Sequence, residues 1–483
     1  MDGQQDSWKR EVMMFVHDSP GKFAANGGAA PELLLFQLED AQEFVAQARS
    51  AIDLWSGSCF VSWLMARALK AVTDDISMEA VLYPSLKADG ALDTPRRGLS
   101  VLPDRFLAVV PAGQGKALAE KAQAALRAEL ARVGDAVMMK SWDKASWDAQ
   151  LKRFPRIVWA THTWQKDADW TANCVALGDK LAARRNTYDF AAWPLKSNGR
   201  KDSLSGIEDA IAEEDGKPYG AMNLIRRYWW RSGLSEKTFR RYSGYFAVLA
   251  ITGDGMAKGA KEFTPALHLK QSEALARFAT DRVRQSMERF GGEMLYARGG
   301  EMLLLVPAAE AITCAQQLRG SFRTEVGGDM VCGIAMGHSM VSPFQMLLRE
   351  AYRVRDAAKR QQASAPMSVV IHKRFGEIIE WGCIWNSVAL EMMDTVAKLS
   401  KAKRISNRFP YVLSQLLQPY GLESPIFSAP VILAEFMHVV SRQGKGLGDE
   451  LFGMATRYLC ENPKGKVQDF INLFMVGNFL NRI

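Results

Sequence analysis

Apolar and polar residues alternate along this chain in a way that predicts two α+β units with the same order of elements. In residues 32–165, short apolar runs indicate strands and longer amphipathic stretches indicate helices. The run Ser56-Gly57-Ser58 predicts a turn before a long apolar helix, CFVSWLMARALKAV. The expected strands are LLLF, AVLYP, RFLAVVP and RIVWATHTW, and the other expected helices cover residues 39–51 and 116–133.

The second unit, residues 244–375, repeats this order more clearly. Its elements follow the sequence strand, helix, strand, strand, helix, strand, which is the split βαβ or ferredoxin-like arrangement. Arg298-Gly299-Gly300-Glu301 predicts the hairpin turn, and Gly291-Gly292 predicts the end of the preceding helix. Two such units indicate an internal duplication. The expected strands are 245–251, 293–297, 302–306 and 330–336, with helices at 272–290 and 308–324.

The remaining segments complete the predicted domain order. Residues 166–243 are polar and broken, with Trp-rich helical pieces, and predict a helical insert. Residues 376–483 have a helical period and predict an all-α C-terminal domain. Residues 1–30 end in GGAAPE, which is typical of a linker.

Composition narrows the class of protein. No apolar run reaches the roughly 18 residues that span a bilayer, and the N-terminus does not resemble a signal peptide, so we expect no membrane partner and a cytoplasmic location. The six cysteines are scattered without a CxxC pair, which argues against a zinc site and a disulfide framework.

The net charge of +8 indicates a polyanionic partner. Two basic clusters are candidate contacts for nucleic acid or partner subunits, because cations neutralise phosphates and interleaved aromatic rings stack on unpaired bases. The alternative for each is a solvated helix face with its tryptophans turned into the core. The first cluster includes Arg226, Arg227, Trp229, Arg231, Arg240 and Arg241, and the second includes Lys398, Lys401, Lys403, Arg404 and Arg408.

Candidate chemistry lies where the first strand of the second unit ends and at the central hairpin. In palm domains of nucleotidyl cyclases and polymerases these segments are adjacent, and their carboxylates hold two divalent metals for phosphoryl transfer. Here the strand ends Ile251-Thr252-Gly253-Asp254, and the hairpin ends Gly299-Gly300-Glu301.

These segments resemble the large palm subunit of type III-B CRISPR effector complexes, the Cmr branch of the Cas-ten family. The family's first strand runs into DGDxMGK and its hairpin is YAGGDD. The stretches HLKQSEALARFA and VCGIAMGHSMVSPFQMLLREAYRVRDAAKR are similar to further family motifs, and QEFVAQARSAIDLWSGSCFVSWL is similar to a motif of the family's first palm. The resemblance covers about residues 32–160 and 244–375. It implies an α+β fold with two ferredoxin-like palm domains, at 31–165 and 244–375.

The departures from the family pattern concern the acidic residues. Thr252 stands where the first metal-binding aspartate belongs, which leaves Asp254. In the hairpin, counting back from Pro307 places Gly300 and Glu301 at the two acidic positions, whereas counting from the glycines places Glu301 and Met302 there. Either count leaves one acid missing from each segment, so we expect a degenerate site. Two alternatives stay open: Asp254 and Glu301 hold a single metal or ATP, or both are solvated turn residues.

The resemblance also implies nucleotide contacts at Gly299, Gly300, His338, Ser339 and Lys258. Structural roles are the alternative for His338, and a plain surface position is the alternative for Lys258. His17 and Asp18, in HDSPGK, resemble the start of the family's HD nuclease domain. The first palm begins about a dozen residues later, so we expect residues 1–30 to be a remnant of that domain without metal-dependent DNA cleavage.

The leading hypothesis from the sequence is a scaffold. The chain would be the large subunit of an RNA-guided antiviral complex, binding guide RNA, target RNA and the backbone, small and 5′-end-capping subunits, with no required cofactor. The alternative is an active cyclase that polymerises ATP, with Mg or Mn, into cyclic oligoadenylate on target recognition. A stand-alone diguanylate-cyclase-like signalling domain is a third hypothesis, which the duplicated palm disfavours.

Overall fold

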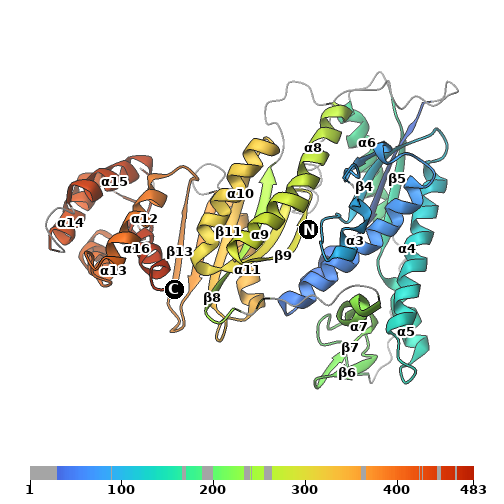
Figure 1. The fold of residues 1–483 in the computed structure, drawn as a ribbon, viewed down its shortest axis with the longest axis horizontal. Helices are drawn as coiled ribbons and strands as arrows, with labels where there is room; N and C mark the ends of the chain where they lie inside the picture. Colours follow the sequence, from blue (N-terminus) through green and yellow to red (C-terminus); the bar gives the residue numbers. More distant parts are fainter. Residues whose placement is uncertain are drawn as a thin grey trace.

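The computed structural model arranges the chain as three blocks in a row (Figure 1). The first palm lies at one end, the second palm in the middle, and a bundle of C-terminal helices at the other end. Arg231 and Asp254 are described by their backbone alone, and His17, Asp18, Arg241 and Lys258 lie outside the described residues. The structure describes residues 30–88, 90–165, 170–187, 199–232, 240, 242–254, 264–360, 366–423, 425–426, 428–442, 448–462 and 465–483.

The first palm has the predicted ferredoxin-like topology. Its antiparallel sheet has the order β3-β4-β2-β5, with α3 and α4 packed on one face and α6 on the other. The sheet contains β2 (Glu32–Leu38), β3 (Val81–Tyr83), β4 (Arg105–Val110) and β5 (Ile157–Thr163). The helices are α2 (Ala41–Ala46), α3 (Ala51–Thr73), α4 (Gly115–Val137) and α5 (Lys144–Arg153), with 3-10 turns at Met78–Ala80, Ala91–Asp93 and Pro95–Arg97.

The turn predicted at Ser56-Gly57-Ser58 is wrong, because these residues lie inside α3. A side chain at Gly57 would meet the Arg226 guanidinium, with its Cβ 3.1 Å from Nε. Ser56 donates a hydrogen bond to the Arg226 carbonyl and accepts one from the Trp229 indole. The small residues therefore make room for a neighbouring helix rather than break α3.

The second palm also begins with the predicted topology, and two further strands extend it. The order β13-β12-β11-β8-β10-β9 contains the ferredoxin-like core β11-β8-β10-β9, with β12 parallel to β11 and β13 at the edge. The strands are β8 (Tyr245–Asp254), β9 (Glu293–Arg298), β10 (Glu301–Pro307), β11 (Asp329–His338), β12 (Met367–His372) and β13 (Ile378–Cys383). This sheet therefore continues past residue 375, where the sequence pattern predicts its end.

Helices cover both faces of this sheet. The helical segment after β8 contains one π-helical turn, and Gly291 ends it in the left-handed conformation at φ 62°, as its sequence predicts. The helices are α8 (Pro265–Arg277), the π turn (Phe278–Val283), α9 (Arg284–Phe290), a 3-10 turn (Ala308–Glu310), α10 (Ala311–Glu325) and α11 (Phe344–Arg360).

The segment between the palms is mixed rather than purely helical. It packs beside the first palm, with the Asp202 carboxylate accepting hydrogen bonds from the Gly220 backbone and the Asn223 side chain. Its elements are α6 (Trp170–Asn186), β6 (Ala212–Glu214), β7 (Lys217–Tyr219), α7 (Ala221–Tyr228) and a 3-10 turn (Trp229–Ser232).

The C-terminal region is helical beyond β13, and its core is rich in phenylalanine. Phe409, Phe436, Phe470 and Phe474 stack together, and the same core continues onto the helical face of the second palm. Among the described helices, none is both long and apolar enough to cross a bilayer. The helices are α12 (Val388–Lys401), α13 (Phe409–Leu417), a 3-10 turn (Gln418–Tyr420), α14 (Ala429–Ser441), α15 (Gly448–Glu461) and α16 (Val467–Leu480).

Candidate nucleotide-binding site

The hairpin and the end of β8 lie side by side, as expected for a palm. Glu301 is the register partner of Thr252, and the Gly253 amide donates a hydrogen bond of 2.7 Å to the Gly300 carbonyl. Gly299 and Gly300 form the turn with φ of 57° and 91°, which L side chains rarely adopt. Glu301 is thus the first residue of β10, which favours counting the acidic positions from the glycines.

The face that carries Glu301 is occupied by tyrosines and arginines. Tyr296 and Tyr352 share a hydrogen bond of 2.7 Å between their hydroxyl groups. The Arg298 guanidinium lies 4.7 Å from the centre of the Tyr296 ring, and that of Arg355 lies 4.8 Å from the Tyr352 ring. Both are cation–π distances.

Charges on this face are already compensated within the chain. Burial lowers the pKa of the Arg355 guanidinium, but the nearby carboxylates of Glu301 and Asp356 outweigh that effect, so its pKa is raised. Burial raises the pKa of the Tyr296 hydroxyl, and the Tyr352 and Glu301 side chains add to the increase. Arg298 is the register partner of Glu301 on β9, so a guanidinium group and this carboxylate lie on neighbouring strands on one face of the sheet.

The described side chains offer two carboxylates at this end of the sheet, those of Glu301 and Asp329. Magnesium favours several hard oxygen ligands. At this end of the sheet Glu301 stands opposite Arg298 in the strand register, and Asp329, the register partner of Asp254, accepts hydrogen bonds from two nitrogens of the Arg319 guanidinium at 2.6 and 2.7 Å. Within the described part of the chain, no three His, Cys, Asp or Glu side chains are grouped as metal ligands.

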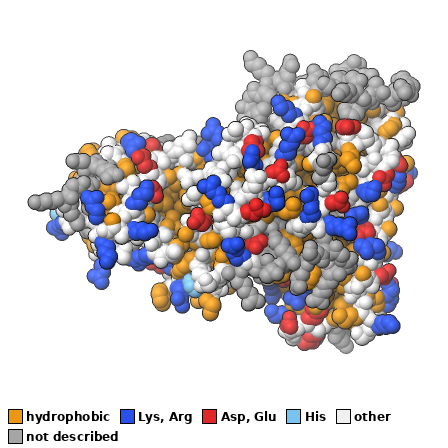
Figure 2. Space-filling model, in the orientation of Figure 1, with side chains coloured by type: hydrophobic (Ala, Val, Ile, Leu, Met, Phe, Trp, Pro, Cys, Tyr) orange, Lys and Arg blue, Asp and Glu red, His pale blue; other side chains and the backbone are white. Residues whose placement is uncertain are grey.

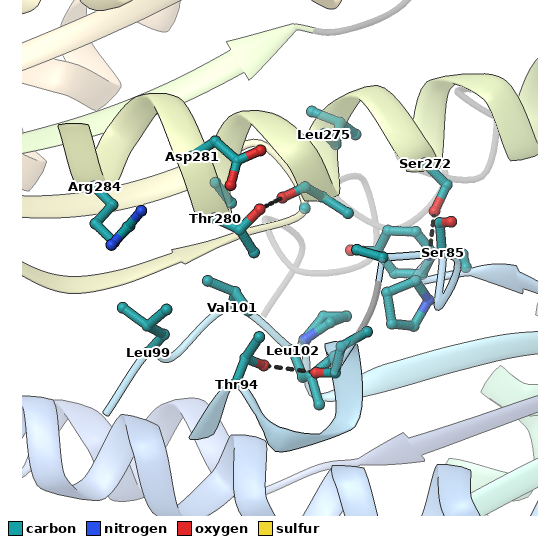
Figure 3. Close-up of a pocket in the computed structure, with 18 of the residues that line it drawn as sticks. Ser85, Thr94, Leu99, Val101, Leu102, Ser272, Leu275, Thr280, Asp281 and Arg284 are labelled. Carbon is teal, nitrogen blue, oxygen red and sulfur yellow. Dashed lines mark hydrogen bonds between the residues drawn. The ribbon is translucent and has the colours of Figure 1, made fainter. Parts of the chain in front are cut away.

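A cavity of about 320 Å³ opens between the two palms and reaches the hairpin at Gly299. Figure 3 shows Asp281, Arg284, Thr280 and Ser272 on the helix above it. Residues 83–103 of the first palm form the opposite wall, where the Ser85 amide donates to the Ser272 hydroxyl at 2.7 Å. Its size falls within the range of small-molecule sites.

Sequence reasoning missed this cavity because two domains form it. The signal was available only in part, since Ser272 lies in the motif HLKQSEALARFA. The wall of the cavity includes the π turn, an irregularity that often occurs at functional sites. A Cβ at Gly299 would clash with the hydroxyl of Tyr83 in the first palm, so the two domains meet at the hairpin tip.

Two family models match these palms. The model described as CRISPR-associated protein Cmr2, N-terminal, matches residues 33–135, and Cas10/Cmr2, second palm domain, matches residues 245–365. The chain is Cas10/Cmr2-like.

Individual relatives of the Cas10/Cmr2-like chain differ in how much they share with it. The CRISPR system Cmr subunit Cmr2 of Pyrococcus furiosus is 40% identical over 57 residues, which are 12% of this chain and 6% of that protein. A type III-B Cmr-beta structure bound to cognate target RNA matches with a TM-score of 0.65 at 9% identity, over 95% of this chain and 84% of that one. Csm1 of T. onnurineus matches with a TM-score of 0.57 at 12% identity, over 94% and 70%. These structural likenesses show a shared fold.

The family resemblance implies nucleotide contacts both at the hairpin and at His338 and Ser339, and the structure separates these two places. His338 is the register partner of Tyr245 at the start of β8, whereas Glu301 is that of Thr252 near its end. Seven residues of strand separate these positions, about 23 Å at 3.3 Å per residue. In this Cas10/Cmr2-like chain, His338 and Glu301 therefore lie at opposite ends of the second sheet.

Two members of the first basic cluster, Arg226 and Trp229, are buried, so the prediction that they contact nucleic acid is wrong. Arg226 is 0% exposed, donates to the Phe44 carbonyl and lies 4.1 Å from the Phe44 ring. Burial lowers the pKa of its guanidinium to about 10. Arg227 lies 4.2 Å from the Tyr219 ring and pairs with Glu214 at 3.5 Å, and Arg240 is exposed.

The second basic cluster is exposed. Lys401 ends α12, and the turn that leads to α13 carries Lys403, Arg404 and Arg408. These four cations form no ion pair with any described residue. The turn is anchored because the Asn478 side chain donates to the Asn407 carbonyl at 2.8 Å and Ile405 is buried. We call these four cations the basic turn.

Proposed function

We propose that this Cas10/Cmr2-like chain is the large subunit of an RNA-guided type III CRISPR effector complex in antiviral defence. It scaffolds guide RNA, target RNA and the other subunits, and its cyclase is degenerate. The observation that carries the proposal is the pairing of two complete palm folds with a hairpin whose remaining acid, Glu301, stands opposite Arg298 in the β9–β10 register. The chain thus keeps the fold of both palms, while its hairpin lacks the set of oxygen ligands that a two-metal site needs.

The basic turn is the RNA contact that the described surface supports best. Its four exposed cations are held on an anchored turn, where they can attract the phosphates of an RNA backbone. Such attraction does not depend on the RNA sequence. The first cluster contributes packing at Arg226 and Trp229, while Arg227, Arg231, Arg240 and Arg241 stay proposed contacts.

The second candidate is synthesis of cyclic oligoadenylate from ATP with Mg or Mn, using Asp254 and Glu301. The observation that favours it is the cavity that adjoins Gly299 and takes its walls from both palms. Gly300 lies against the end of β8 and is proposed to line the same nucleotide site, as is Lys258. No other cofactor is required in either proposal.

Two measurements on the assembled complex separate these functions. Sequencing RNA that copurifies with the full chain should recover guide RNAs, and their absence would contradict the large-subunit proposal. Incubation with ATP, MnCl2 and target RNA should then give no oligoadenylate. A product that disappears in Asp254→Ala and Glu301→Ala variants would establish the second candidate instead.

A further inference from the structure

At the end of the second sheet opposite the hairpin, two loops carry apolar side chains into solvent. One follows β11 and carries Met340 and Val341, which are 80% and 53% exposed. The other joins β12 to β13 and carries Phe375, which is 97% exposed, next to Ile378 at the start of β13, which is 60% exposed. We call these loops the two tips. Figure 2 shows hydrophobic side chains beside a histidine at the lower edge of the central block. Clustered exposed apolar residues mark interaction sites more often than single ones.

Hydrogen bonds fix the first tip. The Val341 and Ser342 amides donate to the His338 carbonyl at 3.0 and 2.9 Å, and the Met340 amide donates to His338 Nδ1 at 3.2 Å. The Ser342 hydroxyl accepts from the His338 amide at 3.2 Å. This accounts for His338 and Ser342, which the sequence motif contains and the nucleotide site does not use.

The second tip is fixed to the first through Tyr245. The Tyr245 ring lies edge-on to the His338 ring at 5.0 Å, and its hydroxyl accepts from the Arg374 amide at 3.0 Å. Gly376 turns the loop at φ 86°, and the Lys373 amide donates to the Glu377 carbonyl at 2.9 Å. The exposed side chains therefore keep a set arrangement, which lowers the entropy lost on binding.

The charged residues beside the two tips indicate which charges a partner carries around its binding pocket. The Lys373 ammonium is engaged by Glu377 at 3.0 Å. Arg374 is exposed and pairs with no described carboxylate, so a cation remains at the edge of the apolar patch. A surface that complements it carries carboxylate groups next to an apolar hollow.

We propose that the two tips dock into an apolar pocket, flanked by acidic side chains, on another protein subunit of the effector complex. This inference rests on the proposed function and adds a specific contact surface to it. The chemistry favours protein over RNA, because Met340, Val341 and Ile378 have no aromatic face on which a base could stack. Phe375, the one aromatic residue among them, suits the central anchor of a protein interface.

The test uses the full chain coexpressed with the other subunits of its complex and its guide RNA. Met340→Ser with Phe375→Ser forms the tip variant, Arg374→Glu probes the rim, and Met139→Ser is the matched control on the first palm, 51% exposed. Because all four positions are on the surface, each variant should melt within about 2 °C of wild type. We expect the tip variant to bind one protein subunit at least about tenfold more weakly, with the control unchanged.

Each other outcome overturns the inference in a distinguishable way. A wild-type complex that assembles, with the tip variant equal to the control, defeats the inference and leaves the proposed function intact. Loss of RNA with all subunits retained assigns the tips to RNA, and loss of a homodimer in sedimentation assigns them to a second copy of the chain. Failure of the wild-type chain to assemble with any subunit or guide RNA defeats both.

Discussion

At the scale of single residues, the charged side chains of this protein divide into those that complete the fold and those that remain available. Arg226 and Arg355 belong to the first group because each is partnered inside the molecule by a ring or a carboxylate. Lys401 and Arg404 belong to the second group. A cluster of charged residues in the sequence does not show which of them are buried. The cluster shows only where charge is dense, whereas burial depends on the helices that pack against it.

Arg226→Ala should lower the free energy of unfolding by about 2–4 kcal/mol, because it leaves a cavity beside α3 and removes a buried hydrogen bond. Its effect on RNA affinity should be negligible at temperatures where the variant is folded. Urea denaturation with an RNA titration measures both quantities. Arg404→Ala is the control with the reverse profile, and an RNA defect in the folded Arg226 variant would contradict the assignment.

Manganese should bind the wild-type hairpin face weakly, and Thr252→Asp should strengthen binding about tenfold or more. The new carboxylate would stand opposite Glu301 in the register and on the same face of the sheet. Electron paramagnetic resonance of free Mn²⁺ gives the affinity without relying on activity. Tight binding by wild type, abolished in Glu301→Gln, would show that the arginines do not block the site.

At the scale of elements, the order of the core strands in the second palm could be predicted from the sequence. The direction in which each strand runs determines which residues lie at the hairpin end of the sheet. Apolar runs at 293–297 and 302–306 identify two adjacent strands because the hairpin that joins them is local in sequence. The separation of His338 from the hairpin depends on strand direction: β11 runs antiparallel to β8, so its last residue lies far from the hairpin. β12 and β13 were missed because their short runs sit between helices. The cavity was beyond reach since it needs the packing of two distant segments.

The hairpin tip offers a test of that packing. Gly299→Ala should destabilise the protein more than Gly327→Ala, although both glycines have positive φ, because only Gly299 meets a neighbour, the Tyr83 hydroxyl. Tyr83→Phe should recover about 1 kcal/mol or more of the stability in a double-mutant cycle. Thermal unfolding of the four variants measures the coupling, and additivity of the two changes would mean that the palms do not touch there.

At the scale of the whole molecule, two hydrophobic cores run across the domain boundaries that the sequence pattern predicts. One core joins the first palm to the face of the second sheet that α11 covers. The other core joins the face that α10 covers to the C-terminal helices. The fold class and the duplication could be predicted, since each palm carries its own periodicity. The shared cores could not be predicted, because an apolar position in the sequence does not show which domain its side chain packs against.

The basic turn is predicted to act on the assembled complex as a whole. Lys401→Glu with Arg404→Glu should weaken RNA retention and reduce the steepness of its salt dependence, by about 0.7 in log–log slope for each phosphate of a single strand that is no longer neutralised. Affinities measured across a salt series give that slope. Lys398→Glu is the matched control, because this lysine on the same helix already pairs with Asp394. A slope that stays the same in the double variant would remove the turn from the RNA path.

The core shared by the two palms also bears on how such a chain diverges. Residues of α3 that face the second palm, and residues of β9 and α11 that face the first, pack into one interior. A change of volume on one side must be matched on the other, so these positions are expected to evolve in pairs. Glu301 and Thr252 lie at the margin of this interior, where a missing carboxylate costs little packing. The fold of the two palms can therefore be kept when a carboxylate at the hairpin is lost.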